Sequence, residues 1–180
     1  MGKNIKVVTK QIIKELYNDG NVNKRILANI RVAPSMSSTK ARALWPLMMK
    51  YMDKEWLSTT GVPTKTENAI YSAIRMYALY QQGQDNLVDG TEKQFFEALR
   101  ELRNGDEDQQ IALDRRVEAI LSATEFSSLM KDLVQIQGIM KSRYNEKIDY
   151  AKLANDLYWF QVNFESMNRV KLVWGQMYFR

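Results

Sequence analysis

The chain has 180 residues and a net charge of +5, and it contains neither cysteine nor histidine. The lack of cysteine excludes disulfides and thiolate catalysis, and the lack of histidine excludes the commonest general base and transition-metal ligand. We therefore expect a protein that is not an enzyme and holds no metal or cofactor. No segment has the ~20 apolar residues of a membrane span, and the N-terminus lacks the apolar core of a signal peptide, which predicts a cytoplasmic protein.

The N-terminal half has the apolar spacing of helices. Steps of three and four residues predict helices at 4–17, 22–32, 40–57 and 65–82. The sequence NDGN ends the first of them, because Asn and Gly accept left-handed backbone geometry. In the third, Pro46 falls within the first two turns, where proline is best tolerated. Thr64 followed by Glu67 has the spacing of a capping box and predicts the start of the fourth.

The C-terminal half continues the helical pattern. Its predicted helices lie at about 91–103, 107–122, 125–143, 149–163 and 165–179. The sequence GQDNLVDG, residues 83–90, is the expected connector between two lobes, 1–88 and 89–180. No stretch alternates β-branched with polar residues as a strand does. The sequence thus predicts an all-α fold of two small helical lobes, the second a helix bundle.

The charge is unevenly distributed along the chain. Residues 1–90 carry 13 basic and 7 acidic residues, residues 91–180 carry 13 and 14, and residues 21–50 carry no acid. Because Lys and Arg neutralise phosphates, this acid-free stretch is a candidate nucleic-acid surface. Its candidate residues are Lys24, Arg25, Arg31, Lys40 and Arg42. The alternative is a solvated basic face with no partner.

A second candidate lies in ALDRRVEAIL, residues 112–121, where Arg115 and Arg116 are adjacent. On a helix they point about 100° apart, so one can face a ligand while the other pairs with a neighbour. The alternative is pairing within the helix, for example of Arg115 with Glu118. The aromatic residues of DLYWFQ, 156–161, belong to a helical pattern that predicts core packing rather than base stacking.

Several segments, taken in order, resemble the CasB family, the small subunit of the type I-E CRISPR Cascade complex. The first are the turn NDGN with ANIRV, the stretch ALWPLM, and the helices AIRMYALYQQ and FFEALRELR. LDRRVEAIL, GIMKSR, IDYAKLANDLYWFQ and the closing RVKLVWGQMYF follow. The resemblance covers almost all of the chain, and the order and spacing of the segments carry it.

This resemblance implies an all-helical, non-catalytic protein that works with the other Cascade subunits and the guide RNA. It implies a pair of copies along the backbone formed around the guide RNA, in contact with opened target DNA and the displaced strand. The basic positions that match the family are Arg31, Arg100, Arg115 and Arg116. The family tends to show an arginine pair in the next helix, but KDLVQIQ (131–137) offers only Lys131.

A protein with this role binds phosphates and leaves sequence recognition to base pairing with the guide. Two other functions stay open from the sequence: a stand-alone helical protein that binds DNA or RNA, and a structural helical adaptor. A stand-alone regulator would need a recognition helix with Asn, Gln or Arg set to reach base edges, and the sequence shows no clear one.

Overall fold

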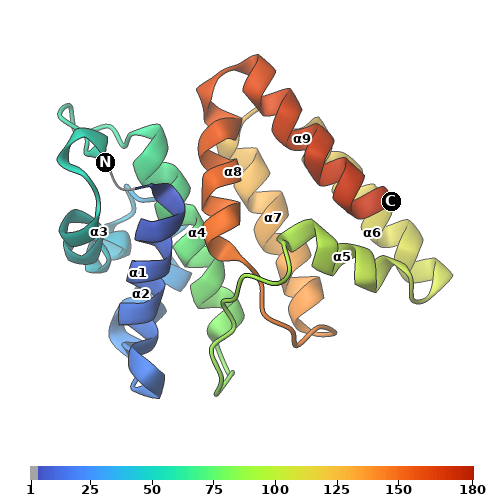
Figure 1. Cartoon of the computed structure of the whole chain (residues 1–180), viewed down its shortest axis with the longest axis horizontal. Coiled ribbons are helices and arrows are strands. Elements are labelled where there is room, and N and C mark those ends of the chain that lie inside the picture. The colour runs from blue at the N-terminus through green and yellow to red at the C-terminus, as the bar shows by residue number, and fades with distance from the viewer. Residues whose placement is uncertain (1–3) are drawn as a thin grey trace. The chain divides into compact units, whose positions relative to one another are not determined.

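The computed structural model describes residues 4–180, which form nine α-helices, three short 3-10 helices and no strand (Figure 1). The α-helices are α1 (Ile5–Tyr17), α2 (Lys24–Arg31), α3 (Trp45–Tyr51), α4 (Lys65–Gln81), α5 (Phe95–Arg103), α6 (Glu107–Ser122), α7 (Phe126–Lys141), α8 (Tyr150–Val162) and α9 (Phe164–Phe179). The 3-10 helices are η1 (Asn18–Gly20), η2 (Thr39–Ala43) and η3 (Lys54–Trp56). The predicted all-α fold is confirmed. Within residues 4–180, no helix is long and apolar enough to cross a membrane.

The predicted signals at the ends of α1 and the start of α4 are present. At the end of α1, Asn18 has left-handed backbone angles, with φ at 49°. At the start of α4, the Thr64 hydroxyl accepts from the Glu67 amide at 3.1 Å, and the Glu67 carboxylate accepts from the Thr64 amide at 2.7 Å. That carboxylate also accepts from the Ser58 amide at 3.1 Å, so the capping box fixes the preceding loop as well.

The expected helix over 40–57 is wrong in its extent. The structure has η2 at Thr39–Ala43, then α3 only from Trp45 to Tyr51, and then η3. Pro46 occupies the first turn of α3. Because proline has no amide hydrogen and its ring clashes with the preceding turn, an α-helix can begin at this position but cannot run through it.

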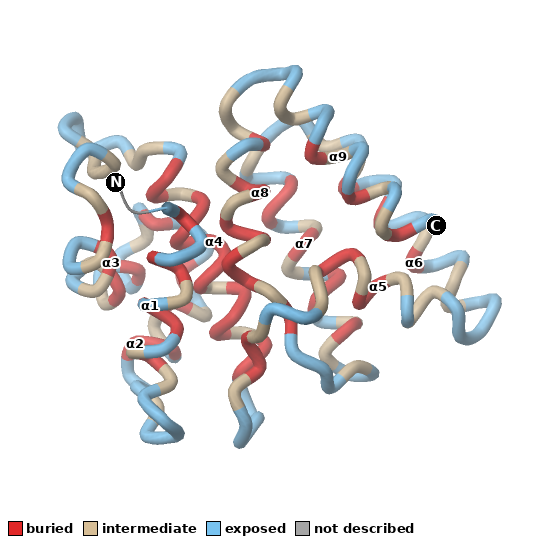
Figure 2. The backbone as a smooth tube through the Cα atoms, in the orientation of Figure 1, coloured by how far each residue is buried: buried red, intermediate tan, exposed pale blue. Residues whose placement is uncertain are grey.

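The chain groups into two compact units, and Figure 2 shows how the buried positions recur along one face of most helices. The first unit comprises residues 1–89 and 150–158, and the second comprises 90–149 and 159–180. The predicted lobes, 1–88 and 89–180, stay a prediction about domains, because this grouping does not test whether either lobe folds alone.

Each unit has its own apolar core. In the first unit, α4 packs against α1 and α2, and 13 of its 17 residues are buried, which makes it the central helix of that unit. In the second unit, α5 packs against α6 and α9, and the rings of Phe96 and Trp174 stack with centroids 4.8 Å apart. The core packing predicted for the aromatic residues of DLYWFQ is confirmed for Phe160, which is 1% exposed, but is wrong for Trp159, which is 46% exposed.

Candidate nucleic-acid interface

Two of the predicted basic residues open helix α2. The Asn23 side chain accepts from the Ile26 amide at 3.1 Å and starts the helix, while Ile26 and Leu27 turn into the core. Lys24 and Arg25 are therefore exposed, and their side chains make no hydrogen bond or ion pair within residues 4–180. The first turn of α2 has no acid, so both cations sit at the positive end of the helix dipole, where an anion would be favoured.

Lys40 and Arg42 project from η2, which packs against α2 in the first unit. Ala41 between them is fully buried, so the two charged side chains turn outward. Lys40 has no hydrogen bond or ion pair within the described part of the chain. The Arg42 guanidinium lies 5.8 Å from the ring centroid of Trp45, within the range of a cation–π contact. We call Lys24, Arg25, Lys40 and Arg42 the N-terminal basic surface.

Arg31 has a different environment from these four. Its Nε donates to the Ala78 carbonyl on α4 at 2.8 Å, and burial lowers the pKa of the guanidinium. The neighbouring Arg75 donates to the carbonyls of Ile30 and Arg31, at 3.1 and 3.0 Å, and so caps the C-terminal end of α2. Arg31 therefore fastens α2 to α4, with part of its side chain still accessible.

Lys50, the last basic residue of the acid-free stretch, is compensated by a distant acid. Its Nζ lies 3.1 Å from a Glu15 carboxylate oxygen, and the Tyr51 hydroxyl donates to the same carboxylate. These contacts, that of Tyr51 first, lower the pKa of Glu15. Only part of the acid-free stretch is thus free to meet an external anion.

In the second unit, the Asp114 carboxylate on α6 accepts hydrogen bonds from side chains of two other helices, α5 and α9. Arg103 donates to its two carboxylate oxygens at 2.8 and 3.2 Å, and the Tyr178 hydroxyl donates at 2.7 Å. The hydrogen bonds from Arg103 are the main cause of a lowered Asp114 pKa, and that of Tyr178 adds to it. Asp114, the only acid directly beside Arg115 in the sequence, therefore already has hydrogen-bond partners other than Arg115.

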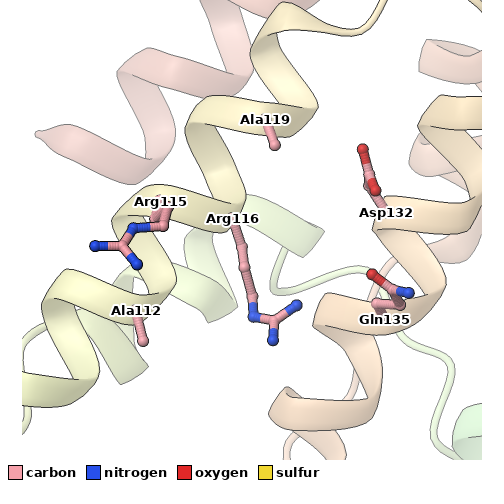
Figure 3. Close-up of a pocket in the computed structure, with 6 residues that line it drawn as sticks. All are labelled: Ala112, Arg115, Arg116, Ala119, Asp132 and Gln135. Carbon is pink, nitrogen blue, oxygen red and sulfur yellow. The ribbon is translucent and has the colours of Figure 1, made fainter.

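Arg115 and Arg116 are exposed on α6 and make no hydrogen bond or ion pair within residues 4–180. The pairing of Arg115 with Glu118 that the sequence left open is not formed. Both arginines line a cavity of about 370 Å³ together with Ala112, Ala119, Asp132 and Gln135. In Figure 3, Arg116 extends into the space between α6 and α7, whereas Arg115 points away from α7.

Arg100, the last predicted residue, is half-buried on α5. Its neighbour Glu101 has a lowered pKa, first because Lys93 donates a hydrogen bond to it and last because of the Arg100 charge. The structure therefore brings the eight predicted residues into two groups, one per unit, with Arg31 and Arg100 the least exposed members. Within residues 4–180, no group of acidic side chains is arranged to hold a metal ion.

The fold is similar to the folds of several solved structures. The crystal structure of CasB from Thermobifida fusca covers 100% of both chains with a TM-score of 0.74 at 22% identity. CasB from Thermus thermophilus covers 95% of this chain and 97% of its own, with a TM-score of 0.66 at 18% identity. Another crystal structure from Thermus thermophilus, of a CRISPR-associated protein of the Cse2 family, covers 99% of both chains with a TM-score of 0.69 at 18% identity.

The family is shown by a match of the sequence to a family model. The model of the family described as CRISPR-associated protein Cse2 matches residues 26–179. The chain therefore belongs to the Cse2 family of CRISPR-associated proteins, which confirms the resemblance to CasB. A comparison with curated proteins found no match.

Proposed function

We propose that this protein is the non-catalytic small subunit of a type I-E Cascade complex, which binds nucleic-acid backbone without sequence preference. In that role it stabilises the target and displaced DNA strands of the R-loop, and it works beside a second copy of itself. Family membership supports a place in a CRISPR system. The observation that carries the binding role is the N-terminal basic surface, whose four cations are exposed and have no acidic partner within residues 4–180.

Uncompensated cations of this kind favour a polyanion over an ordinary protein partner. Protein surfaces normally intersperse charges of both signs, and two cations at a helix N-terminus oppose the helix dipole. Neutralising phosphates releases condensed counterions, so the unfavourable local charge is offset when nucleic acid binds. Exchange of DNA duplex for guide–target duplex is nearly balanced in free energy, so modest backbone contacts are enough to shift it.

The test is target-DNA affinity of a reconstituted Cascade complex that carries a variant of this subunit. The first variant replaces Lys24, Arg25, Lys40 and Arg42 by Ala. Its control removes the same charge from exposed cations outside the candidate interface: Lys14, Lys54, Arg143 and Lys147. Arg31 is left intact because its contact with Ala78 serves the fold.

We expect the four-residue variant to assemble normally and to bind target DNA at least tenfold more weakly at low salt, since ion contacts dominate such affinities. The control variant should bind nearly as wild type does. Equal losses in both variants would mean that net charge alone matters, and an unchanged affinity in the first would refute the proposed surface. A protein recovered only as a free species, bound to DNA without guide RNA, would favour the stand-alone alternative.

A further inference from the structure

Trp45 and Arg42 share the outer side of the segment that runs from η2 into α3. A 3-10 helix has three residues per turn, so side chains three positions apart lie above one another. Ala41 and Leu44 have this spacing and are fully buried, which anchors the segment in the core of the first unit. Arg42 and Trp45 each follow one of them, so both turn outward, with Arg42 exposed and Trp45 half-buried.

The indole of Trp45 is held in one orientation. Its Nε1 donates to the carbonyl of the buried Met36 at 3.2 Å, which ties the polar edge of the ring to the loop before η2. Pro46 follows directly and restricts the backbone at the start of α3. Within residues 4–180, this ring contacts no other aromatic ring. Because the ring is already ordered, little freedom is lost when a flat group stacks on it.

Arg42 keeps its hydrogen-bond donors unused in the described part of the chain. Its guanidinium lies over the Trp45 ring, 5.8 Å from the centroid, and forms no hydrogen bond or ion pair there. A guanidinium has five N–H donors in one plane, binds phosphate through them, and stacks on flat π-systems. The pair therefore combines two flat groups with free donors for phosphate. Lys40, exposed two positions earlier, adds a point charge to the same surface.

This combination fits a single strand better than a duplex. In a duplex, the neighbouring base pairs cover both faces of each base, so a protein reaches only the backbone and the edges in the grooves. An unstacked base of a single strand can lie on an aromatic ring or a guanidinium plane while its phosphate meets nearby cations. Such stacking tolerates any sequence, because every base has a π-face.

We propose that Trp45 and Arg42 form a stacking platform for one unstacked base, which gives the N-terminal basic surface a preference for single strands over duplexes. The inference rests on the proposed nucleic-acid binding and deepens it. The cations bind the phosphates of either form, whereas the platform acts only where the strands have separated. An R-loop contains such a strand, because the displaced strand has lost its complement.

The test uses the full-length protein at one low salt concentration and two labelled single-stranded oligomers of equal length. One consists of thymidine, and the other has the same sugar–phosphate chain with abasic sites, so the two carry the same charge and differ only in their bases. The ratio of their dissociation constants therefore separates base contacts from phosphate contacts. We expect the thymidine oligomer to bind roughly fivefold more tightly, the lower end of what one stacked base provides.

Three variants locate this preference. Trp45→Ala removes the ring and should abolish the preference, while the affinities for the abasic oligomer and for a duplex of the same length change little. Trp45→Phe keeps a ring without the hydrogen bond to Met36 and should keep most of the preference, which separates stacking from a role in the fold. Arg42→Lys keeps the charge without the planar guanidinium, so it should reduce the preference and leave abasic binding unchanged.

Trp159→Ala is the matched control. Trp159 is the most exposed tryptophan of the described residues, at 46%, and it lies in the second unit, away from the N-terminal basic surface. This variant should keep the wild-type preference for the thymidine oligomer. Circular dichroism checks that each variant remains folded.

Different results overturn different proposals. Equal, salt-dependent binding of both oligomers by the wild type would refute the platform and leave the proposed function standing. A preference that survives Trp45→Ala would place the base contact elsewhere and also refute the platform. If Trp45→Ala weakens binding of both oligomers equally, the ring only supports the fold or the position of Arg42, which again refutes it. If Trp45→Ala leaves both affinities unchanged but keeps the protein out of the reconstituted complex, the ring contacts a protein partner instead. No binding of either oligomer would count against both proposals.

Discussion

Replacing Asp114 by Asn tests the hydrogen bonds that this carboxylate accepts in the second unit. The carboxylate accepts two hydrogen bonds from Arg103 and one from Tyr178, which join α6 to α5 and α9. Hydrogen bonds to a charged group contribute roughly 1.5–3 kcal/mol each when buried. The Arg103 and Asp114 side chains are 22% and 24% exposed, so solvent screening reduces this figure, and Asn retains one acceptor. We expect the free energy of unfolding to fall by about 2 kcal/mol.

Urea unfolding followed by circular dichroism measures this loss. Glu118→Gln is the matched control on the same helix, because Glu118 is exposed and its side chain has no partner within residues 4–180. That control should change the free energy of unfolding by less than ~0.5 kcal/mol. A loss for Asp114→Asn no larger than that of the control would refute the stabilising role of the contact.

The loss of stability in Asp114→Asn should depend on pH. The pKa of Asp114 lies below its ordinary value of 3.8, mainly because Arg103 donates hydrogen bonds to the carboxylate. The folded state therefore favours the ionised form, and its contribution is complete above the unfolded pKa and is lost as the pH falls through the folded pKa. The difference in stability between wild type and Asp114→Asn should be constant near neutral pH and shrink below about pH 4. A difference that stays constant or widens in acid would contradict this.

Two further substitutions test contacts in the first unit by thermal unfolding. Thr64→Ala removes the hydroxyl of the α4 capping box and should cost about 1 to 2 kcal/mol, as N-cap losses do; no downward shift of the melting temperature would count against the cap. Asp89→Ala removes a carboxylate, with its side chain only 5% exposed, that accepts from Lys10 at 2.8 Å and from the Tyr150 amide at 3.2 Å. It should cost about 3 kcal/mol, because a buried donor loses its acceptor; a cost below ~1 kcal/mol would show that the site relaxes. The matched controls are exposed residues of the same types, Thr59 and Asp85.

Local signals in the sequence were enough to predict most of the fold. The spacing of apolar residues placed a helix at 107–122, where α6 lies, and Thr64 with Glu67 marked the start of α4. These features depend on interactions within a few residues, which a sequence shows directly. The helix expected over 40–57 was wrong because the α-helix begins only at Pro46's turn, although the apolar pattern runs on across it. At this position the restriction on proline decides the structure, and the apolar spacing does not.

The residue types of the candidate site were predictable from the sequence, but which of its charged side chains have partners within the fold was not. The acid-free stretch drew attention to its cations, yet Lys50 is paired with Glu15, 35 positions away. Arg31 matched a family position and proved to donate to the Ala78 carbonyl. The Asp132 and Gln135 wall opposite Arg116 was missed, because only the packing of α7 on α6 brings it there. Such contacts are tertiary, so no spacing rule reveals them.

The most direct test of the proposed function is the salt dependence of target-DNA binding by the complex. The logarithm of the affinity is measured against the logarithm of the salt concentration for wild type and for the variant with Ala at Lys24, Arg25, Lys40 and Arg42. Each lost phosphate contact should flatten the slope by roughly 0.7 to 0.9, so four should flatten it by about 3. The charge-matched control should keep the wild-type slope. A four-residue variant with the wild-type slope would contradict phosphate binding by this surface.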